Sequence, residues 1–229
     1  MCNRFALHHD ADELTERFKI DIIGDLIPAR FNIAPLDNSI AIRAEKGKRI
    51  VEQGQWGLLS PSETDAPRPY RVTNARVETL LERSMFRDLL RDGRRLIPAS
   101  GFYEWKELEG EKQPFYFSRR DGGPIAFAGL WQTSSPEEET PHAEFVIITG
   151  EPNALVANYH NRMPIILSLE AENIWLLGST TDAIKQLVPF SEKLMQAWPV
   201  SRKVNSTRAA GSDCISAVQL FMTPSLFED

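Results

Sequence analysis

The second residue of the chain is a cysteine, a position that gives it chemistry no internal cysteine has. Removal of Met1 would leave Cys2 with a thiol and a free α-amine. The amine condenses with an aldehyde to an imine, and the thiol adds to the imine carbon and closes a thiazolidine ring. Because this second step is intramolecular, proximity can lower its barrier by roughly 7–11 kcal/mol in well-oriented cases. Reference pKa values of about 8.5 for the thiol and about 7.7–8.0 for the amine keep part of each group nucleophilic at pH 7. Position alone does not distinguish such a cysteine from an incidental one.

Glu104 is a candidate acid–base residue because it stands between Tyr103 and Trp105 in a strand-like aromatic stretch. Burial among aromatic rings would raise the pKa of its carboxyl toward the range useful for proton transfer. Strand alternation equally allows the opposite arrangement, in which Tyr103 and Trp105 point inward and Glu104 points to solvent. The residues themselves leave both readings open.

Composition limits the classes of function. The 229 residues are 42% hydrophobic and can bury a substantial core. The chain has no long apolar run and no signal-peptide pattern, so we expect a cytoplasmic protein without membrane contact. Two cysteines and four histidines without HExxH or HxH spacing predict no metal site and no cofactor. The net charge of −6 argues against a surface that is basic overall, although residues 68–95 hold eight arginines against four acids, a local balance of +4. An ion-paired helix face explains such a run as well as a phosphate track does.

Hydrophobic periodicity predicts a chain dominated by strands. Leu14, Phe18 and Ile22 recur at helical spacing, so we expect a helix over 10–23 that ends at Gly24. A second helical repeat covers Val77–Leu90. Strands are expected at Ser39–Ala44, Arg49–Trp56, Arg95–Ala99, Phe102–Lys106, Pro114–Ser118, Ile125–Trp131 and Glu144–Thr149, and short helices at Ser168–Leu177, Thr181–Leu187 and Ser191–Ala197.

The connections between these strands are of hairpin length, which implies antiparallel pairing, and the helices interrupt the strands rather than alternate with them. We therefore expect an α+β fold of mainly antiparallel, barrel-like twisted sheets with several flanking helices. Pro61–Pro69 reads as a long surface loop, and no linker divides the chain. The prediction is one domain over residues 1–229.

Four segments carry polar residues where a packed element would not need them: Met1–Phe5, Thr73–Thr79, Pro98–Lys106 and His160–Pro164. Together they resemble the SRAP family, the SOS response-associated peptidases. Further matches are Phe31–Pro35, Trp56–Leu58, Ala128–Trp131, Trp198–Ser201 and Val204–Asn205. The order and spacing of these matches extend over nearly the whole chain, which makes the resemblance specific.

The resemblance implies a sensor of abasic sites in single-stranded DNA, in which Cys2 couples to the aldehyde of the abasic sugar through a thiazolidine. It implies an acid–base role for Glu104 and proton transfer near the sugar and its 3′ phosphate for His160. Asn74 would contact a sugar hydroxyl or the adduct. The alternatives are an exposed loop histidine and an Asn74 that caps a helix N-terminus.

Arg4, Arg76 and Arg162 match family positions that face DNA, and guanidinium forks suit phosphate. Pairing with Glu78 is the competing use for Arg76. Trp56 is a candidate for stacking on a base, with a buried core position as the alternative. We expect a monomer whose partner is abasic single-stranded DNA, and an enzyme that forms the crosslink. Met1 would be removed either by the protein itself, as the family name implies, or by an aminopeptidase, and a lyase-type activity is a further associated reaction.

The chain departs from the family pattern in three places. Asn3 replaces the glycine usual after the cysteine, Tyr159-His160-Asn161 lacks the aspartate common before Arg-Met-Pro, and Pro61–Pro69 lacks a tryptophan. Two other functions remain open. One is an N-terminal-nucleophile amidohydrolase or peptidase, in which the Cys2 thiolate attacks an amide. The other is a non-catalytic single-stranded DNA binder.

Overall fold

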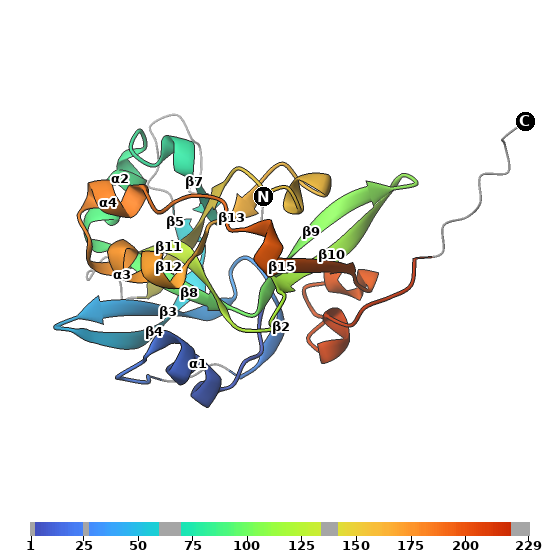
Figure 1. The fold of residues 1–229 in the computed structure, drawn as a ribbon, viewed down its shortest axis with the longest axis horizontal. Coiled ribbons are helices and arrows are strands. Elements are labelled where there is room, and N and C mark those ends of the chain that lie inside the picture. Colours follow the sequence, from blue (N-terminus) through green and yellow to red (C-terminus); the bar gives the residue numbers. More distant parts are fainter. Residues whose placement is uncertain (1–2, 25–27, 60–69, 134–141, 221–229) are drawn as a thin grey trace, which may run out of the picture.

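The computed structural model of the chain describes residues 3–24, 28–59, 70–133 and 142–220. Two twisted sheets and a short hairpin form the body of the molecule, and the helices lie around them (Figure 1). The α+β class and the mainly antiparallel pairing predicted from the sequence are confirmed. The seven strands that the sequence predicts are all present, with small changes at their ends.

The first sheet places the N-terminal strand in its interior. All of its pairings are antiparallel, and Phe5 lies opposite Phe102 on one side and Ile33 on the other. Arg4, which precedes this strand, therefore lies beside the strand that contains Glu104. The order is β15 (Met195–Pro199), β10 (Glu111–Arg119), β9 (Gly101–Leu108), β1 (Phe5–Leu7) and β2 (Arg30–Ile33).

The second sheet is larger and strongly curved. Its order is β13 (Met163–Pro164), β12 (Ala143–Gly150), β4 (Lys48–Trp56), β3 (Asn38–Glu45), β8 (Arg94–Ala99), β11 (Ile125–Thr133) and β14 (Ile166–Leu167). β12 also pairs with β11, and it runs parallel to β4 and to β7 (Asn74–Arg76). β3 and β8 share one residue pair and β4 and β12 share two, so the strands splay there and the sheet remains twisted rather than forming a closed barrel. β5 (Leu58–Leu59) and β6 (Arg71–Val72) form the separate hairpin.

Aromatic side chains join the two sheets. Phe5 of β1 lies 5.9 Å from Phe127 of β11, and Phe102 of β9 lies 6.2 Å from the same ring. Fully burying each such ring contributes about 1.5–3 kcal/mol to folding. The opposite face of the first sheet carries a smaller buried cluster made of Ala6, Tyr103, Tyr116, Val200, Val204 and Cys214. Both faces of β9 are therefore covered.

The first helix is shorter than predicted. α1 (Ala11–Phe18) begins with Asp10 as N-cap in a capping box and buries Leu14 and Phe18, as expected. It ends at Lys19, which adopts a left-handed conformation with φ 51°, and not at Gly24. Beyond this point Ile22 bridges to Ile50 of β4, so its match to the helical spacing reflects a strand contact.

The predicted helix over Val77–Leu90 is wrong in its continuity. A 3₁₀ turn η1 (Val77–Thr79) is followed, after a break at the extended Arg83, by α2 (Ser84–Asp92). In one α-helix, Leu80 and Phe86 would point about 120° apart, whereas the break lets both reach the core, where each is 1% exposed.

The C-terminal predictions have mixed outcomes. α3 (Leu169–Leu177) is confirmed, and α4 (Thr180–Ile184) is shorter than predicted. The helix predicted over Ser191–Ala197 is wrong: the 3₁₀ turn η3 (Glu192–Leu194) leads into β15, which pairs with β10. The predicted loop Pro61–Pro69 lies outside the described residues. Within the described ranges, none of the helices has the length and apolar character needed to cross a membrane.

Candidate active site

Glu104 faces the interior. Side chains alternate along β9: Phe102 and Glu104 lie on the face that packs on the main core, while Tyr103 and Trp105 face the smaller cluster. The alternative in which Glu104 points to solvent is therefore wrong. Glu104 is 2% exposed, and its Oε1 atom is buried without a hydrogen bond from any described residue. Burial raises the pKa of the Glu104 carboxyl to about 7, against a smaller opposing effect of the Trp105 backbone N–H. The carboxyl can therefore give or take a proton near neutral pH.

His160 lies next to this carboxyl. Its Nδ1 atom is 3.8 Å from Glu104 Oε1 and 3.1 Å from both the backbone nitrogen and the carbonyl oxygen of Arg162. Nδ1 accepts from the Arg162 N–H in one tautomer and donates to the Arg162 carbonyl in the other. Burial lowers the pKa of His160, so the ring is mostly neutral at pH 7. A neutral imidazole and a carboxyl of raised pKa form a pair that can exchange protons with a bound molecule.

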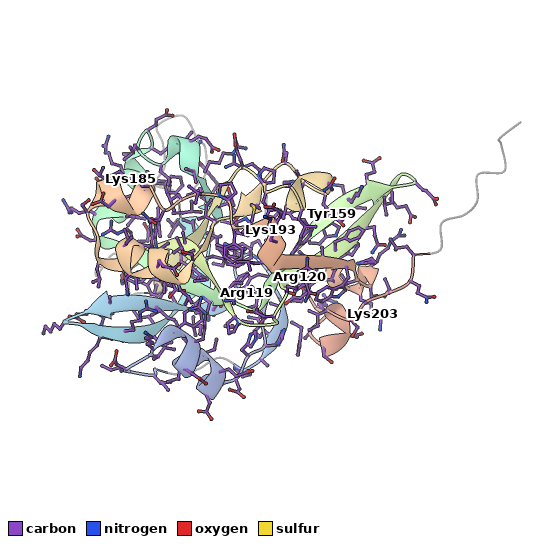
Figure 2. All side chains as sticks on the ribbon, in the orientation of Figure 1. Arg119, Arg120, Tyr159, Lys185, Lys193 and Lys203 are labelled. Atoms are coloured by element: carbon purple, nitrogen blue, oxygen red, sulfur yellow. The ribbon has the colours of Figure 1, made fainter. Side chains whose placement is uncertain are left out.

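The residue before His160 fixes the imidazole in place. Tyr159, labelled in Figure 2, packs against β10, with its ring centre 4.6 Å from that of Phe115 in a tilted contact and 5.1 Å from that of Phe117 in an edge-on contact. Lys106 Nζ lies 5.4 Å from the centre of the Tyr159 ring. The His160 backbone N–H donates to the carbonyl of Val156, in the 3₁₀ turn η2 (Val156–Asn158). The histidine is therefore held by its neighbours and is not a freely exposed loop side chain.

The N-terminal end of β1 lies at the same site as Glu104 and His160. The Tyr103 backbone N–H donates to the carbonyl of Arg4, which extends the β1–β9 pairing by a further residue. Asn3 and Arg4 line a cavity of about 470 Å³ together with Glu104, Trp105, Lys112, His160 and Asn205. Cys2 lies outside the described residues. Asn3, the residue that follows Cys2 in the chain, lines the same cavity as the Glu104–His160 pair.

Arg162 is engaged within the protein. Its two terminal nitrogens lie 2.7 and 2.9 Å from the carboxylate oxygens of Glu78, and Nη2 also donates to the Thr149 carbonyl at 2.7 Å. The hydrogen bonds from Arg162 lower the pKa of Glu78. Glu78, which the sequence offered as a partner for Arg76, thus pairs with Arg162 instead. Arg76 is exposed and makes no ion pair with a described residue.

Asn74 belongs to a second cavity. It is 7% exposed, its Nδ2 donates to Thr73 Oγ1 at 3.2 Å, and it does not act as a helix N-cap, so that alternative is wrong. It lines a space of about 330 Å³ with Tyr70, Arg71, Val72, Thr73, Arg76, Thr79, Arg83 and Phe86. β7 pairs with β12 and β12 with β13, and Arg162 hydrogen-bonds Thr149 of β12, so a continuous ladder connects this cavity to the His160 loop. The structure brings Arg4, Glu104 and His160 together, with Asn74 and Arg76 in the neighbouring space.

Of the two readings of Trp56, the buried core position, which the sequence favoured over stacking on a base, is confirmed. Trp56 is fully buried, its ring lies 5.2 Å from Phe5, and its Nε1 donates to the Thr73 carbonyl at 2.8 Å. It supports the backbone just before Asn74 from inside the core. Among the residues that the structure describes, no group of three or more His, Cys, Asp and Glu side chains is arranged to hold a metal ion.

Four lining residues were not among the predicted site residues: Asn3, Trp105, Lys112 and Asn205. Trp105 and Asn205 lie within segments that match the family pattern, so a closer reading of those segments could have found them. Lys112 sits near the tip of the β9–β10 hairpin, opposite Glu107, and carries no signal in the sequence. With Arg4 it adds positive charge to the cavity.

Solved structures share this architecture. A protein from Bacteroides thetaiotaomicron superimposes with a TM-score of 0.81 over 95% of this chain and 100% of its own, at 22% identity, which shows the common fold. A protein from Bordetella bronchiseptica superimposes with a TM-score of 0.76 over 87% of this chain and 100% of its own, at 25% identity. The molecule is therefore an α+β protein of a recurring fold, with a polar acid–base cavity where its N-terminal strand begins.

Sequence comparison identifies the family. The model of the SOS response associated peptidase (SRAP) family matches residues 1–207. The abasic site processing protein YoqW of Bacillus subtilis (strain 168) is 36% identical over 95% of this chain and 100% of its own length. The abasic site processing protein YedK of Escherichia coli (strain K12) is 32% identical over 95% and 100%. The chain belongs to the SRAP family.

Proposed function

We propose that this protein senses abasic sites in single-stranded DNA and joins them covalently to Cys2 after removal of Met1. The relatives named abasic site processing proteins, which align over nearly all of the chain, support the choice of lesion. The observation that carries the proposal is the cavity in which Asn3 faces the Glu104–His160 pair. Cys2 is the next residue, and consecutive Cα atoms are about 3.8 Å apart across a trans peptide bond, so the aminothiol belongs at or beside this cavity.

The reaction needs proton transfers that this pair can supply. The abasic sugar is mostly a closed hemiacetal, and opening it moves a proton from the C1′ hydroxyl to the ring oxygen. The Cys2 amine then attacks C1′, and the carbinolamine loses its hydroxyl as water to give the imine. The protonated Glu104 carboxyl is the donor we assign to that leaving hydroxyl, and neutral His160 is the base we assign to the proton lost from nitrogen.

Ring closure completes the capture. The Cys2 thiolate adds to the imine carbon, the C=N electron pair moves to nitrogen, and nitrogen takes up the thiol proton. The net reaction of aldehyde with aminothiol releases one water and gives the thiazolidine. If closure fails, the imine instead acidifies the C2′ hydrogen, and its loss expels the 3′ phosphate. We assign the lyase-type activity to that competing path.

The arginines serve DNA binding in this proposal. Arg4 and Lys112 lie at the cavity and Arg76 is exposed beside the second cavity, where each can meet a phosphate. Arg162 is the exception, since a phosphate would first have to displace the Glu78 carboxylate from the Arg162 guanidinium. We assign Asn74 to a sugar or adduct contact made from the second cavity.

The α-amine of Cys2 is free only after Met1 is removed, and this dependence provides the test. A chain that keeps Met1 has an amide nitrogen on Cys2, which cannot form the imine that the Cys2 thiol closes to a thiazolidine. Met1-cleaved protein mixed with an abasic single-stranded oligonucleotide should give an adduct that survives denaturant, seen by intact mass spectrometry, while Met1-retained protein binds the strand without a stable adduct. Equal yields from the two forms would rule out the thiazolidine.

The same preparations test the remaining proposals. Cys2→Ser should abolish the stable adduct and leave binding, whereas for a simple single-stranded DNA binder the wild type would also give no adduct. Glutamine hydrolysis by the Met1-cleaved form, without adduct, would favour the amidohydrolase alternative. We propose that the protein removes Met1 itself. Synthesis in an aminopeptidase-free translation system should then yield Cys2 as the first residue of the wild type.

A further inference from the structure

Two segments that match the family pattern, Phe31–Pro35 and Val204–Asn205, contact each other next to the cavity. Neither has a role in the chemistry described above. Asn32 on β2 is 3% exposed, and its Nδ2 donates to carbonyl oxygens in the segment that follows β15: those of Ser206 at 2.9 Å, Ala209 at 3.0 Å and Val204 at 3.4 Å. This segment contains the 3₁₀ turn η4 (Arg202–Asn205), which lies beside the first sheet where Figure 2 labels Lys203. One buried amide group therefore fixes the turn against β2.

The fixed turn presents Asn205 to the cavity. Asn205 Oδ1 accepts a hydrogen bond from Trp105 Nε1 at 2.7 Å, and its backbone carbonyl accepts one from Arg4 Nη2 at 3.3 Å. Trp105 adjoins Glu104 on β9, and Arg4 follows Asn3. Asn205 thus contacts one residue on the strand that carries Glu104 and one residue just before the neighbouring strand β1.

We propose that Asn205 is a positioning residue that holds the Trp105 indole and the Arg4 guanidinium in the walls of the cavity, and that Asn32 holds Asn205. The proposal rests on the proposed function and adds two residues to its site. An indole turns about two side-chain torsions, and Trp105 is only half-buried, so packing alone does not fix it. A single hydrogen bond to Asn205 favours one orientation by roughly two- to tenfold.

A double-mutant cycle tests the indole contact. Asn205→Ala removes the acceptor but leaves the carbonyl that Arg4 uses, and Trp105→Phe removes the donor but keeps an aromatic ring. With saturating abasic single-stranded DNA, Asn205→Ala should slow adduct formation roughly three- to tenfold, while the half-saturating DNA concentration changes less than twofold. In the Trp105→Phe background the same substitution should have no further effect.

Controls separate this proposal from a general loss of structure. Asn173→Ala is matched, because Asn173 is also exposed and its Oδ1 also accepts a side-chain hydrogen bond, in this case from Arg49, on α3 and away from the cavity. It should react at the wild-type rate. Asn32→Asp removes the donor that holds the turn, so it should slow the reaction and also raise the half-saturating concentration, since Arg4 loses its support.

The outcomes are distinct. Absence of any adduct from Met1-cleaved wild type overturns the proposed function itself. If the wild type reacts, a full rate for Asn205→Ala, or an equal loss in the Trp105→Phe background, overturns the positioning role. A wild-type rate and half-saturation for Asn32→Asp overturn its part in the arrangement.

Discussion

Glu104→Gln should stabilise the protein at high pH relative to low pH. The buried carboxyl of the wild type has a pKa of about 7, against 4.5 for the ordinary group. Between these values the folded state holds a proton that the unfolded state has released. Wild-type stability therefore falls as pH rises from about 4.5 to about 7, whereas glutamine has no proton to lose.

The size of the effect follows from the same two values. At 1.36 kcal/mol per pH unit, the interval from 4.5 to about 7 corresponds to about 3 kcal/mol, fully developed above pH 7. In a chain of 229 residues, each kcal/mol shifts the melting temperature by roughly 2–4 °C. The melting temperature of Glu104→Gln relative to wild type should therefore rise by roughly 6–12 °C between pH 4 and pH 8.

Thermal denaturation of both proteins across this pH range measures the difference, in which the titrations of groups that do not interact with Glu104 cancel. Glu144→Gln is the matched control, since Glu144 is 1% exposed but its pKa is shifted the other way. Burial raises the pKa of Glu144, but hydrogen bonds from the Leu59 N–H, Gln132 and Arg71 outweigh it and lower the pKa overall. Its replacement should destabilise at pH 7, and less so as pH falls. A Glu104→Gln difference that is constant with pH would refute the raised pKa, and with it the reason for assigning proton donation to this residue. The same variant should slow adduct formation with little change in DNA affinity.

Two further predictions concern the arginines. Arg76→Ala should weaken binding of single-stranded DNA and reduce the slope of log affinity against log salt by about 0.7, measured by fluorescence anisotropy at several salt concentrations. Lys185→Ala, at the C-cap of α4, is the control because Lys185 pairs with Asp182 and lines neither cavity; it should leave that slope unchanged. An unchanged slope for Arg76→Ala would argue against a phosphate contact at this residue. Glu78→Gln should tighten DNA binding about two- to fivefold, because it removes the carboxylate that occupies the Arg162 fork. Weaker binding by this variant would make Arg162 a structural residue.

The long strands could be predicted because their apolar patterns are set by burial on the sheet faces, as in β3, β4 and β8 to β12. β1 and β2 escaped prediction because a strand of three or four residues is too short to show a period. β15 was taken for a helix because its residues follow a helical spacing, and only its pairing with the distant β10 decides its conformation. Tertiary contacts likewise break the helix at Arg83.

The site was predicted in part for a similar reason. Glu104 could be singled out from its aromatic neighbours, but which face it occupies depends on what covers each side of the first sheet. His160 is brought to within 3.8 Å of it by the packing of Tyr159, which no local pattern encodes. The pairing of Arg162 with Glu78 joins residues far apart in the sequence and could not be read from either segment.

Because β1 lies between β2 and β9 in the first sheet, the site can be assembled only after β9 has been synthesised. One neighbour of β1, β2, leaves the ribosome soon after it, but β9 and the His160 loop follow much later. A nascent chain that loses Met1 early would carry an aminothiol before the carboxyl and imidazole that assist it are made. Because domains fold as units as they emerge, the proposed site is assembled only once the chain through Asn205 has folded. If the proposed function is correct, assisted capture of an abasic sugar is confined to molecules whose synthesis is nearly complete.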